Sequence, residues 1–323
     1  MSDRDLTIPV SPSNQLTGAT ATASAEASLG RYVRDDDRKP LFHYTSPIAL
    51  VSMLKESDDP RIYATNIRYL NDSSEYVLTR DLFVSRLTAY LKTAEDEDVA
   101  SYLGYLERNT GRDHGTDGDF YVVSLSANGD ELGQWRGYCP PDGGYSVGFE
   151  HGELLKAAKN EIGLIPGPWK LVECEYEAEI QIILVDSAIA SSVEAFHRVD
   201  SENENIISKY FRGEIEKFPE VLARRILDLD AAIESLAPVL KHSAFVDEEE
   251  WRLISPRIID GDPNVHFRGG RFSVIPFVYF DMPPIRQVIV GPSSLQDLSA
   301  RAIAQLTQVP IPTRSKIPLR VLQ

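Results

Sequence analysis

The sequence predicts an α+β fold whose core is a mixed, mostly antiparallel sheet with a large helical insertion. Segments rich in β-branched and aromatic residues, the composition typical of strands, are grouped towards both ends of the folded part of the chain. Between them, residues from about 185 to 241 are mostly helical in character and show no strong strand pattern. Neither the G-x-G-x-x-G dinucleotide turn nor the G-x-x-x-x-G-K-S/T phosphate loop occurs, so the two commonest phosphate-binding loops are absent from the sequence.

The first part of the chain is expected to lie outside this fold. Residues 1–30 are rich in Ser, Thr, Ala and Pro, and residues 31–39 are mostly charged. Because such segments cannot bury enough apolar surface to order themselves, residues 1–39 are predicted to be a disordered or loosely attached arm. Residues 40–323 then form a single domain that carries the helical insertion.

The first half of this domain is expected to mix strands and helices. Residues 40–45 have the composition of a strand, and Ser46 with Pro47 is a helix cap followed by proline at the first helical position. Asp72 and Glu75 have the spacing of a capping box, which opens a helix ending near Lys92. The other expected elements are a strand over 61–65, a loop over 93–118 with a short helix near 99–106, a strand over 120–126 and a helix over 130–138.

The second half is expected to return to strands after the helical insertion. The expected elements are a strand over 145–149, a helix over 152–160, a long strand over 169–177, strands over 249–255, 272–280 and 286–290, and a last helix over 295–306.

Charge and composition limit the function. The chain has 49 acidic and 33 basic residues and a net charge of −16, so it should not bind bulk duplex nucleic acid, whose phosphates an acidic surface repels. No run of about 18 apolar residues and no secretory signal is present, so we expect a cytoplasmic protein without a membrane span. Cys139 and Cys174 are expected to be free thiols, and no metal site is indicated.

Three short signatures of aromatic and polar residues lie far apart in the chain. They are His43-Tyr44-Thr45, the stretch 61–72 with the motifs RIYATN and YLND, and Glu248–Arg252 with the sequence EEEWR. Each is expected on or beside a strand, so all three can converge on one cleft. The residue types suit a bond between a sugar and nicotinamide better than a metal or a serine nucleophile.

Seven separated motifs resemble a bacterial domain-of-unknown-function family, number 2971. The motifs arrive in order over roughly residues 40–295 and are HYTS, IYATN–RYLND–SSE, VVSLS, QWRGY, GYSVGF, F-x-x-E-x-E-W-R and VIVGP. That resemblance implies no chemistry.

The first elements also resemble, more distantly, the ADP-ribosyltransferase fold of the diphtheria-toxin and poly(ADP-ribose) polymerase type. His43 and Thr45 match its first-strand motif, Tyr63 matches the tyrosine of its second strand, and Glu248 or Glu250 matches its late glutamate. The resemblance implies an enzyme that cleaves NAD and transfers ADP-ribose to an unknown acceptor. Such activities belong to bacterial toxins and to defence against phage.

The chemistry of these side chains fits the same reaction. Cleavage of the nicotinamide–ribose bond passes through a cationic sugar, which a nearby carboxylate stabilises. Glu248 and Glu250 are two apart, so an extended strand directs both to one face and Glu249 to the other. Tyr63 and Tyr69 are rings on which the cationic nicotinamide can stack. His43 and Thr45 can address the ribose and the carboxamide.

Further side chains beside these motifs are expected to contact the ligand. They are Tyr44, Thr65, Asn66, Asn71, Ser124, Ser126, Trp135 and Arg136, with Arg61 and Arg68 as further partners for the diphosphate. Four of them also have a structural interpretation. Asn71 belongs to a turn before a capping box, Ser124 and Ser126 can be buried serines bonded to backbone, and Trp135 can be core.

Three other functions remain open at this point. One is a non-catalytic nucleotide-binding or sensor module on the same fold, in which the glutamates hold the ligand without turnover. The second is an NAD hydrolase with water as acceptor. The third is a protein-interaction scaffold whose aromatic motifs are only core.

Overall fold

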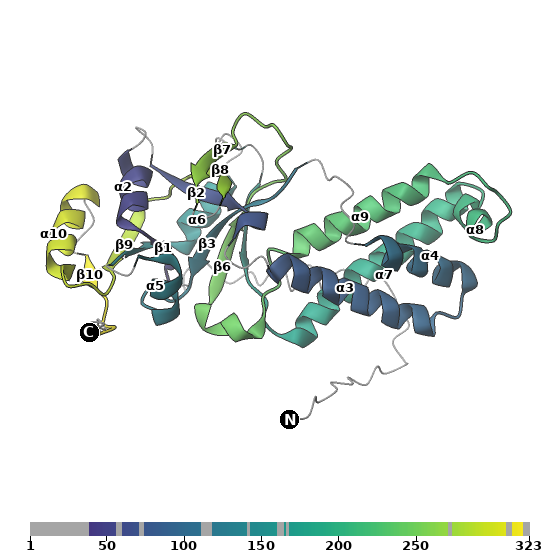
Figure 1. Cartoon of the computed structure of the whole chain (residues 1–323), viewed down its shortest axis with the longest axis horizontal. Helices are drawn as coiled ribbons and strands as arrows, with labels where there is room; N and C mark the ends of the chain where they lie inside the picture. Colours follow the sequence, from purple (N-terminus) through teal and green to yellow (C-terminus); the bar gives the residue numbers. More distant parts are fainter. Residues whose placement is uncertain are drawn as a thin grey trace, which may run out of the picture.

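The computed structural model describes residues 39–55, 60–70, 74–110, 118–140, 143–159, 165, 168–270, 273–307 and 312–318. The molecule is elongated, with a sheet and its covering helices at one end and a bundle of helices at the other (Figure 1). The predicted arm up to residue 38 and most of the predicted capping box at 72–75 lie outside the described residues.

The sheet confirms the α+β prediction. Within the described part of the chain it has ten strands, with β6 pairing with both β3 and β5 beside the path β10-β9-β4-β1-β3-β2-β8-β7. All neighbouring strands pair antiparallel except β9 and β10. The strands are β1 Leu41–Thr45, β2 Arg61–Asn66, β3 Tyr121–Ser126, β4 Tyr145–Phe149, β5 Lys170–Glu173, β6 Glu250–Ile254, β7 His266–Gly269, β8 Val274–Asp281, β9 Ile285–Val290 and β10 Thr313–Arg314.

One group of helices packs on the sheet. They are α2 Pro47–Lys55, α5 Leu132–Tyr138, α6 His151–Ala158 and α10 Gln296–Thr307. Side chains of α2, α6 and α10 enter the main core together with strand residues such as Val147 and Val278. Trp135 of α5 instead belongs to a small separate cluster with Phe42 and Tyr44, the residues that alternate with the main-core side of β1.

The other group of helices forms the bundle. Its members are α3 Ser74–Thr93, α4 Glu97–Asn109, α7 Ala178–Glu202, α8 Ile206–Phe211 and α9 Glu220–Leu236 (Figure 1). They share a second hydrophobic core, which includes Phe83, Leu106, Val185 and Ile233. Because α3 and α4 lie between β2 and β3 whereas α7 to α9 lie between β5 and β6, two insertions in the sheet build one bundle.

This arrangement corrects three boundaries. The expected insertion at 185–241 begins earlier, at Ala178, and has α3 and α4 as partners. The short helix expected near 99–106, within the loop over 93–118, is α4, which is longer at both ends and which Asp96 caps by accepting from the N–H groups of Asp98 and Val99. The expected long strand over 169–177 is the short β5, followed by a single bridge between Glu175 and Leu240.

Helix α7 is the one helix in the described residues that is long and apolar enough to cross a membrane. Its side chains Leu184, Val185, Ile189 and Phe196 are buried in the core of the bundle. Its apolar composition is therefore accounted for by its place between the other helices.

The sheet divides at β3. One edge of β3 pairs with β6 along its length, from Val122 opposite Ile254 to Ser126 opposite Glu250. The other edge is shared, since β1 pairs with it at Ser126 and β2 pairs with it at Val122 and Tyr121. Between these points β1 and β2 diverge. We call this divergence the fork, and the candidate site lies there.

Candidate functional site

A cavity of about 280 Å³ opens at the fork. Its walls come from β1, β2 and β3, from helices α2 and α5, and from single residues of β6, β7 and β8. Seven of the predicted site residues line it: His43, Tyr44, Thr45, Tyr63, Thr65, Tyr69 and Ser124. The first two signatures of the sequence therefore converge on one cavity.

His43 lies deep in this cavity. Its Nδ1 is 3.0 Å from the carbonyl oxygen of Ser124 on β3. Burial lowers the pKa of His43, and the positive charge of Arg268 lowers it further, against the opposing effect of the hydrogen bond to Ser124. The imidazole is therefore neutral at pH 7.

The β2 wall presents an aromatic ring and a hydroxyl. Tyr63 donates from its hydroxyl to Oγ of Ser52 on α2 over 2.9 Å, and its ring centroid lies 4.7 Å from that of Phe277. Thr65 accepts at Oγ1 from Nη2 of Arg268 over 2.9 Å. Tyr69, 43% exposed, lies at the mouth of the cavity.

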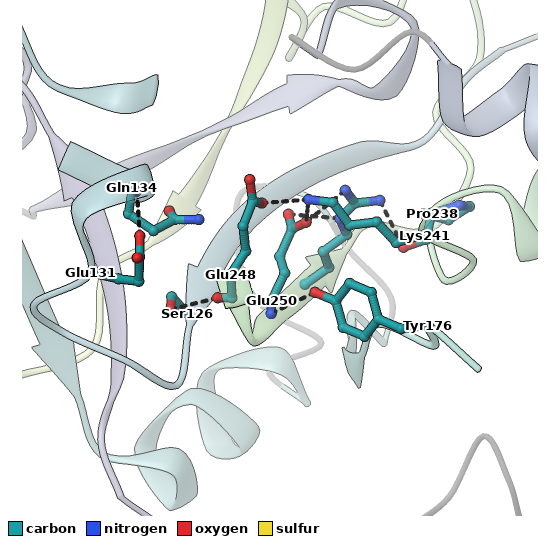
Figure 2. Close-up of polar contacts among 9 residues, drawn as sticks. Ser126, Glu131, Gln134, Tyr176, Pro238, Lys241, Glu248 and Glu250 are labelled. Atoms are coloured by element: carbon teal, nitrogen blue, oxygen red, sulfur yellow. Dashed lines mark hydrogen bonds and ion pairs between the residues drawn. The ribbon is translucent and has the colours of Figure 1, made fainter. Parts of the chain in front are cut away.

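Beside the cavity, four charged side chains form a buried ion cluster of Lys241, Glu248, Glu250 and Arg252 (Figure 2). Lys241 donates from Nζ to Oε2 of Glu248 over 2.6 Å and also contacts the carboxylate of Glu250. Arg252 donates from Nε and Nη2 to the two carboxylate oxygens of Glu250 over 2.9 and 3.0 Å. Its Nη1 donates to the carbonyl oxygen of Pro238 over 3.0 Å.

The cluster pairs two basic with two acidic side chains, and its Glu250 and Lys241 are both held in the charged form. Burial alone would raise the pKa of Glu250, but Arg252 and Lys241 outweigh burial and lower it to about 2. Burial would lower the pKa of Lys241, but Glu250 and Glu248 outweigh burial and raise it. Two cations then face two anions, a balance that makes such burial tolerable.

Arg252 and Tyr138 connect the ion cluster to the cavity, because both line it. Burial raises the pKa of the Tyr138 phenol, and the negative charges of Glu250 and Glu248 raise it further. Among the described residues, neither Glu248 nor Glu250 lines the cavity itself. Of the late signature, Arg252 therefore lines the cavity, and the carboxylate of Glu250 lies behind the Arg252 side chain.

The two glutamates converge by a different route from the one expected. Glu248 ends the 3-10 helix η2, Ser243–Glu248, and β6 begins only at Glu250. Between them Glu249 is exposed and adopts a left-handed backbone with φ of 42°. The chain reverses there, so Glu248 and Glu250 meet at Lys241 although they are not on one strand.

Comparison with known proteins covers part of this site. Residues 134–253 match the model of a family described as Protein of unknown function (DUF2971). The match runs from α5 to β6 and so includes Tyr138, Lys241 and the EEEWR motif. It supports the DUF2971 resemblance over that region.

No curated protein and no solved structure matches the chain. The comparisons therefore do not bear on the ADP-ribosyltransferase resemblance, which stays a prediction.

Two predicted contacts within or beside the DUF2971 match have other roles. Trp135 is buried in the small cluster, its ring 4.7 Å from that of Tyr44 and edge-on to it, and it donates from Nε1 to Asp130. Ser126 is buried and donates from Oγ to the carbonyl oxygen of Glu248 over 2.7 Å. Trp135 is therefore core packing and Ser126 is a serine bonded to backbone, as in their structural interpretations.

The predicted contacts Asn66, Arg61, Arg68 and Arg136 do not line the cavity. Asn66 donates from Nδ2 to Asp119 over 2.9 Å, and Arg68 pairs with the same carboxylate over 2.7 Å. Arg61 lies over the ring of Tyr279, 5.2 Å from its centroid, and Arg136 is exposed on α5. Asn71 lies outside the described residues.

The cations that do line the cavity are Arg252 and Arg268, neither of which was predicted as a ligand contact. Arg252 could have been predicted, since alternation places it on the same face of β6 as Glu250. Arg268 could not, because β7 was not predicted. Among the described residues, no group of three or more His, Cys, Asp or Glu side chains is arranged to hold a metal ion.

Proposed function

We propose that the fork cavity binds NAD and that the protein is an ADP-ribosyltransferase-like enzyme. The observation that carries this proposal is the meeting of His43 and Thr45 of β1 with Tyr63 of β2 in one cavity beside the buried carboxylate of Glu250. An anionic partner near a ring-stacking site is what cleavage of a cationic N-glycoside requires.

The size of the cavity suits one half of the dinucleotide. Small-molecule pockets are roughly 300–1,000 Å³, and this cavity, at about 280 Å³, is at the lower limit. We therefore assign the nicotinamide and its ribose to the cavity and leave the adenosine half at the mouth. There, Tyr69 is exposed and available for stacking.

Each wall has a role in this pose. The ring of Tyr63 faces the cationic nicotinamide, an arrangement favoured by the negative face of an aromatic ring. His43, neutral and protonated at Nδ1 by its bond to Ser124, offers Nε2 as an acceptor for a ribose hydroxyl.

The reaction breaks the bond between C1′ of the ribose and N1 of the nicotinamide, whose electron pair leaves with the neutral nicotinamide. The acceptor then forms a new bond to C1′ and loses a proton. We assign the carboxylate of Glu250, whose pKa is lowered to about 2, to face the developing positive charge from behind Arg252, with Glu248 beside it at Lys241.

One observation favours a second candidate, a nucleotide-binding or sensor module without turnover. Both carboxylate oxygens of Glu250 are bonded to Arg252, and Lys241 holds the same group. A carboxylate held by two cations has less charge to offer a developing oxocarbenium ion than a free one. Glu248 bonds to Lys241 and is 19% exposed, so it is the more available of the two.

Incubation with NAD and chromatographic detection of free nicotinamide tests the proposal. We expect nicotinamide release to fall by about 10²–10³ in Glu248→Gln or Glu250→Gln, with little change in the matched control Glu249→Gln, whose side chain is exposed. Circular dichroism of each variant checks that the fold is kept. Free ADP-ribose as the only sugar product would indicate the hydrolase, and ADP-ribose on an added acceptor the transferase.

Binding without turnover would support the sensor module. In that case calorimetry should show NAD binding that Tyr63→Leu weakens, with no nicotinamide released by the parent protein. No NAD binding by the parent protein would contradict both candidates.

A further inference from the structure

The charges around the fork cavity are unequal. Among the described residues that line it, none is Asp or Glu, whereas Arg252 and Arg268 are cationic and His43 is neutral. The whole chain has a net charge of −16, so a cavity lined by cations is a local exception. Such an exception attracts an anion and orients it.

The two arginines differ in how far they are neutralised. Arg252 gives its donors to Glu250 and to the carbonyl oxygen of Pro238. Arg268 has no carboxylate partner among the described residues, and its Nη2 donates to Oγ1 of Thr65. A guanidinium has five N–H donors, so within the described part of the chain most of those of Arg268 remain for a ligand.

The sheet geometry explains how Arg268 reaches the cavity. It lies on the exposed edge strand β7 opposite Ile275 of β8, and β8 in turn separates β7 from β2. Its side chain crosses β8 to reach Thr65 on β2. Ile275 lines the cavity too, as expected if Arg268 passes over it. The guanidinium is thereby held at the mouth of the cavity by a neutral hydroxyl, with its charge intact.

Partial burial lowers the pKa of Arg268, with the opposing effect of Tyr63 smaller. An arginine remains charged at neutral pH even so, because its pKa starts above 12. The cation also contributes to keeping His43 neutral. The cavity thus combines one permanent positive charge at its mouth with the neutral imidazole of His43 and the ring of Tyr63 in its walls.

We propose that Arg268 binds a phosphate group of the ligand at the mouth of the fork cavity and so determines its specificity for nucleotides over nucleosides. The proposal rests on the nucleotide-binding function above and identifies the side chain that reads the phosphate. A planar guanidinium can donate two parallel N–H bonds to two phosphate oxygens, a geometry that neither lysine nor a neutral side chain offers.

Calorimetric titration of Arg268→Gln with three nicotinamide compounds tests this. NAD carries a diphosphate, nicotinamide mononucleotide one phosphate, and nicotinamide riboside none. We expect the affinity for NAD and for the mononucleotide to fall about 10- to 100-fold, and that for the riboside to change by less than about twofold. Arg268→Lys should recover part of the loss, since it restores the charge without the fork.

The matched control is Arg286→Gln. Arg286 is also a strand arginine, but it is exposed on β9, pairs with Glu150 over 2.7 Å and does not line the cavity. It should leave all three affinities unchanged.

Equal loss for the riboside and the phosphorylated compounds in Arg268→Gln would mean that Arg268 only shapes the cavity. Unchanged affinities would mean that the phosphate lies elsewhere, and either result overturns the proposal while NAD binding by the parent protein keeps the proposed function.

A titration with inorganic pyrophosphate tests the phosphate site at Arg268 even if the protein does not bind NAD. If the parent protein binds none of the nicotinamide compounds, the proposed function fails. Pyrophosphate binding that Arg268→Gln removes and Arg286→Gln preserves would then still support a phosphate site at Arg268. The absence of pyrophosphate binding in that situation, or binding that Arg268→Gln does not alter, would overturn it.

Discussion

Nδ1 of His43 lies 3.0 Å from the carbonyl oxygen of Ser124, at the point where β1 and β2 leave the same edge of β3. A carbonyl oxygen only accepts, so Nδ1 carries the hydrogen, and Nε2 of the neutral ring is an acceptor. The fork leaves a stretch of strand edge without a strand neighbour, and the imidazole supplies a donor there. His43 thus donates from Nδ1 to the carbonyl oxygen of Ser124 at the fork and presents Nε2 to the ligand as an acceptor.

We therefore expect His43 to be the Nδ1–H tautomer and uncharged from pH 6.5 upwards. Because its pKa is lowered in the folded state, the stabilisation from this histidine is present above pH 6.5 and is lost as the pH falls below it. Nitrogen-15 NMR of the imidazole measures both properties, with His43→Gln identifying the signal. An Nε2–H tautomer, or titration at or above the ordinary pKa of 6.5, would contradict the assignment.

The ion cluster should be stabilising only as a complete set. Glu250→Gln leaves Lys241 and Arg252 buried with one carboxylate fewer, so the free energy of unfolding should fall by about 3–5 kcal/mol. The exposed Glu249→Gln should change it by less than about 0.5 kcal/mol. Urea unfolding of the three proteins at pH 7 measures the difference, and equal stabilities would show that the cluster does not hold β6.

The same cluster predicts the response to acid. The pKa of Glu250 is lowered from 4.5 to about 2 in the folded state, so its contribution is complete above pH 4.5 and declines as the pH falls towards 2. A shift of this size corresponds to roughly 3 kcal/mol. The stability difference between the parent protein and Glu250→Gln should therefore shrink between pH 5 and pH 3, and a constant difference over that range would contradict the assigned charges.

The sequence-based predictions were accurate where a structural element is determined by residues close together in the sequence. The β-branched run Tyr121–Ser126 and the Ser46-Pro47 cap were sufficient to predict β3 and α2, because strand composition and capping act within a few residues. The strand β7 was missed because all four of its residues are exposed and carry no apolar alternation.

The site was predictable only in part for a similar reason. His43, Tyr63 and Ser124 lie on predicted strands, and their meeting required only that those strands be neighbours. Arg268 depends on long-range geometry, because its side chain crosses β8 to reach Thr65 on β2. Lys241 is close in sequence to Glu248 and Glu250, but the ion pairs depend on the turn of η2 between them, which was not predicted.

Ser126 and Ser124 form a matched pair for separating stability from binding. Ser126→Ala removes a buried hydroxyl that bonds to the backbone of Glu248 and Asn128, so it should cost about 1–3 kcal/mol of stability. Ser124 lies in the cavity wall, so Ser124→Ala should alter ligand affinity and change the free energy of unfolding by less than about 0.5 kcal/mol. Thermal unfolding and calorimetry distinguish the two, and a reversed pattern would contradict the assignment of Ser126 to the fold.

Binding to bulk duplex DNA or RNA should be weak. With 49 acidic and 33 basic residues, the affinity for random-sequence duplex should be no better than roughly 10⁻⁴ M at physiological salt. Arg61 and Arg68, which were predicted as partners for a diphosphate, lie over the ring of Tyr279 and against the carboxylate of Asp119. A gel-shift titration at several salt concentrations measures this, and tight binding that weakens steeply with salt would point to a nucleic-acid enzyme.

The most direct test of the central claim is a crystal structure with a carbocyclic NAD analogue, whose nicotinamide bond cannot be cleaved. We expect the nicotinamide ring in the fork cavity against Tyr63, with its ribose towards His43 and the first phosphate at Arg268. An analogue bound elsewhere on the molecule, with the fork cavity unchanged, would contradict the assignment of this cavity as the NAD site.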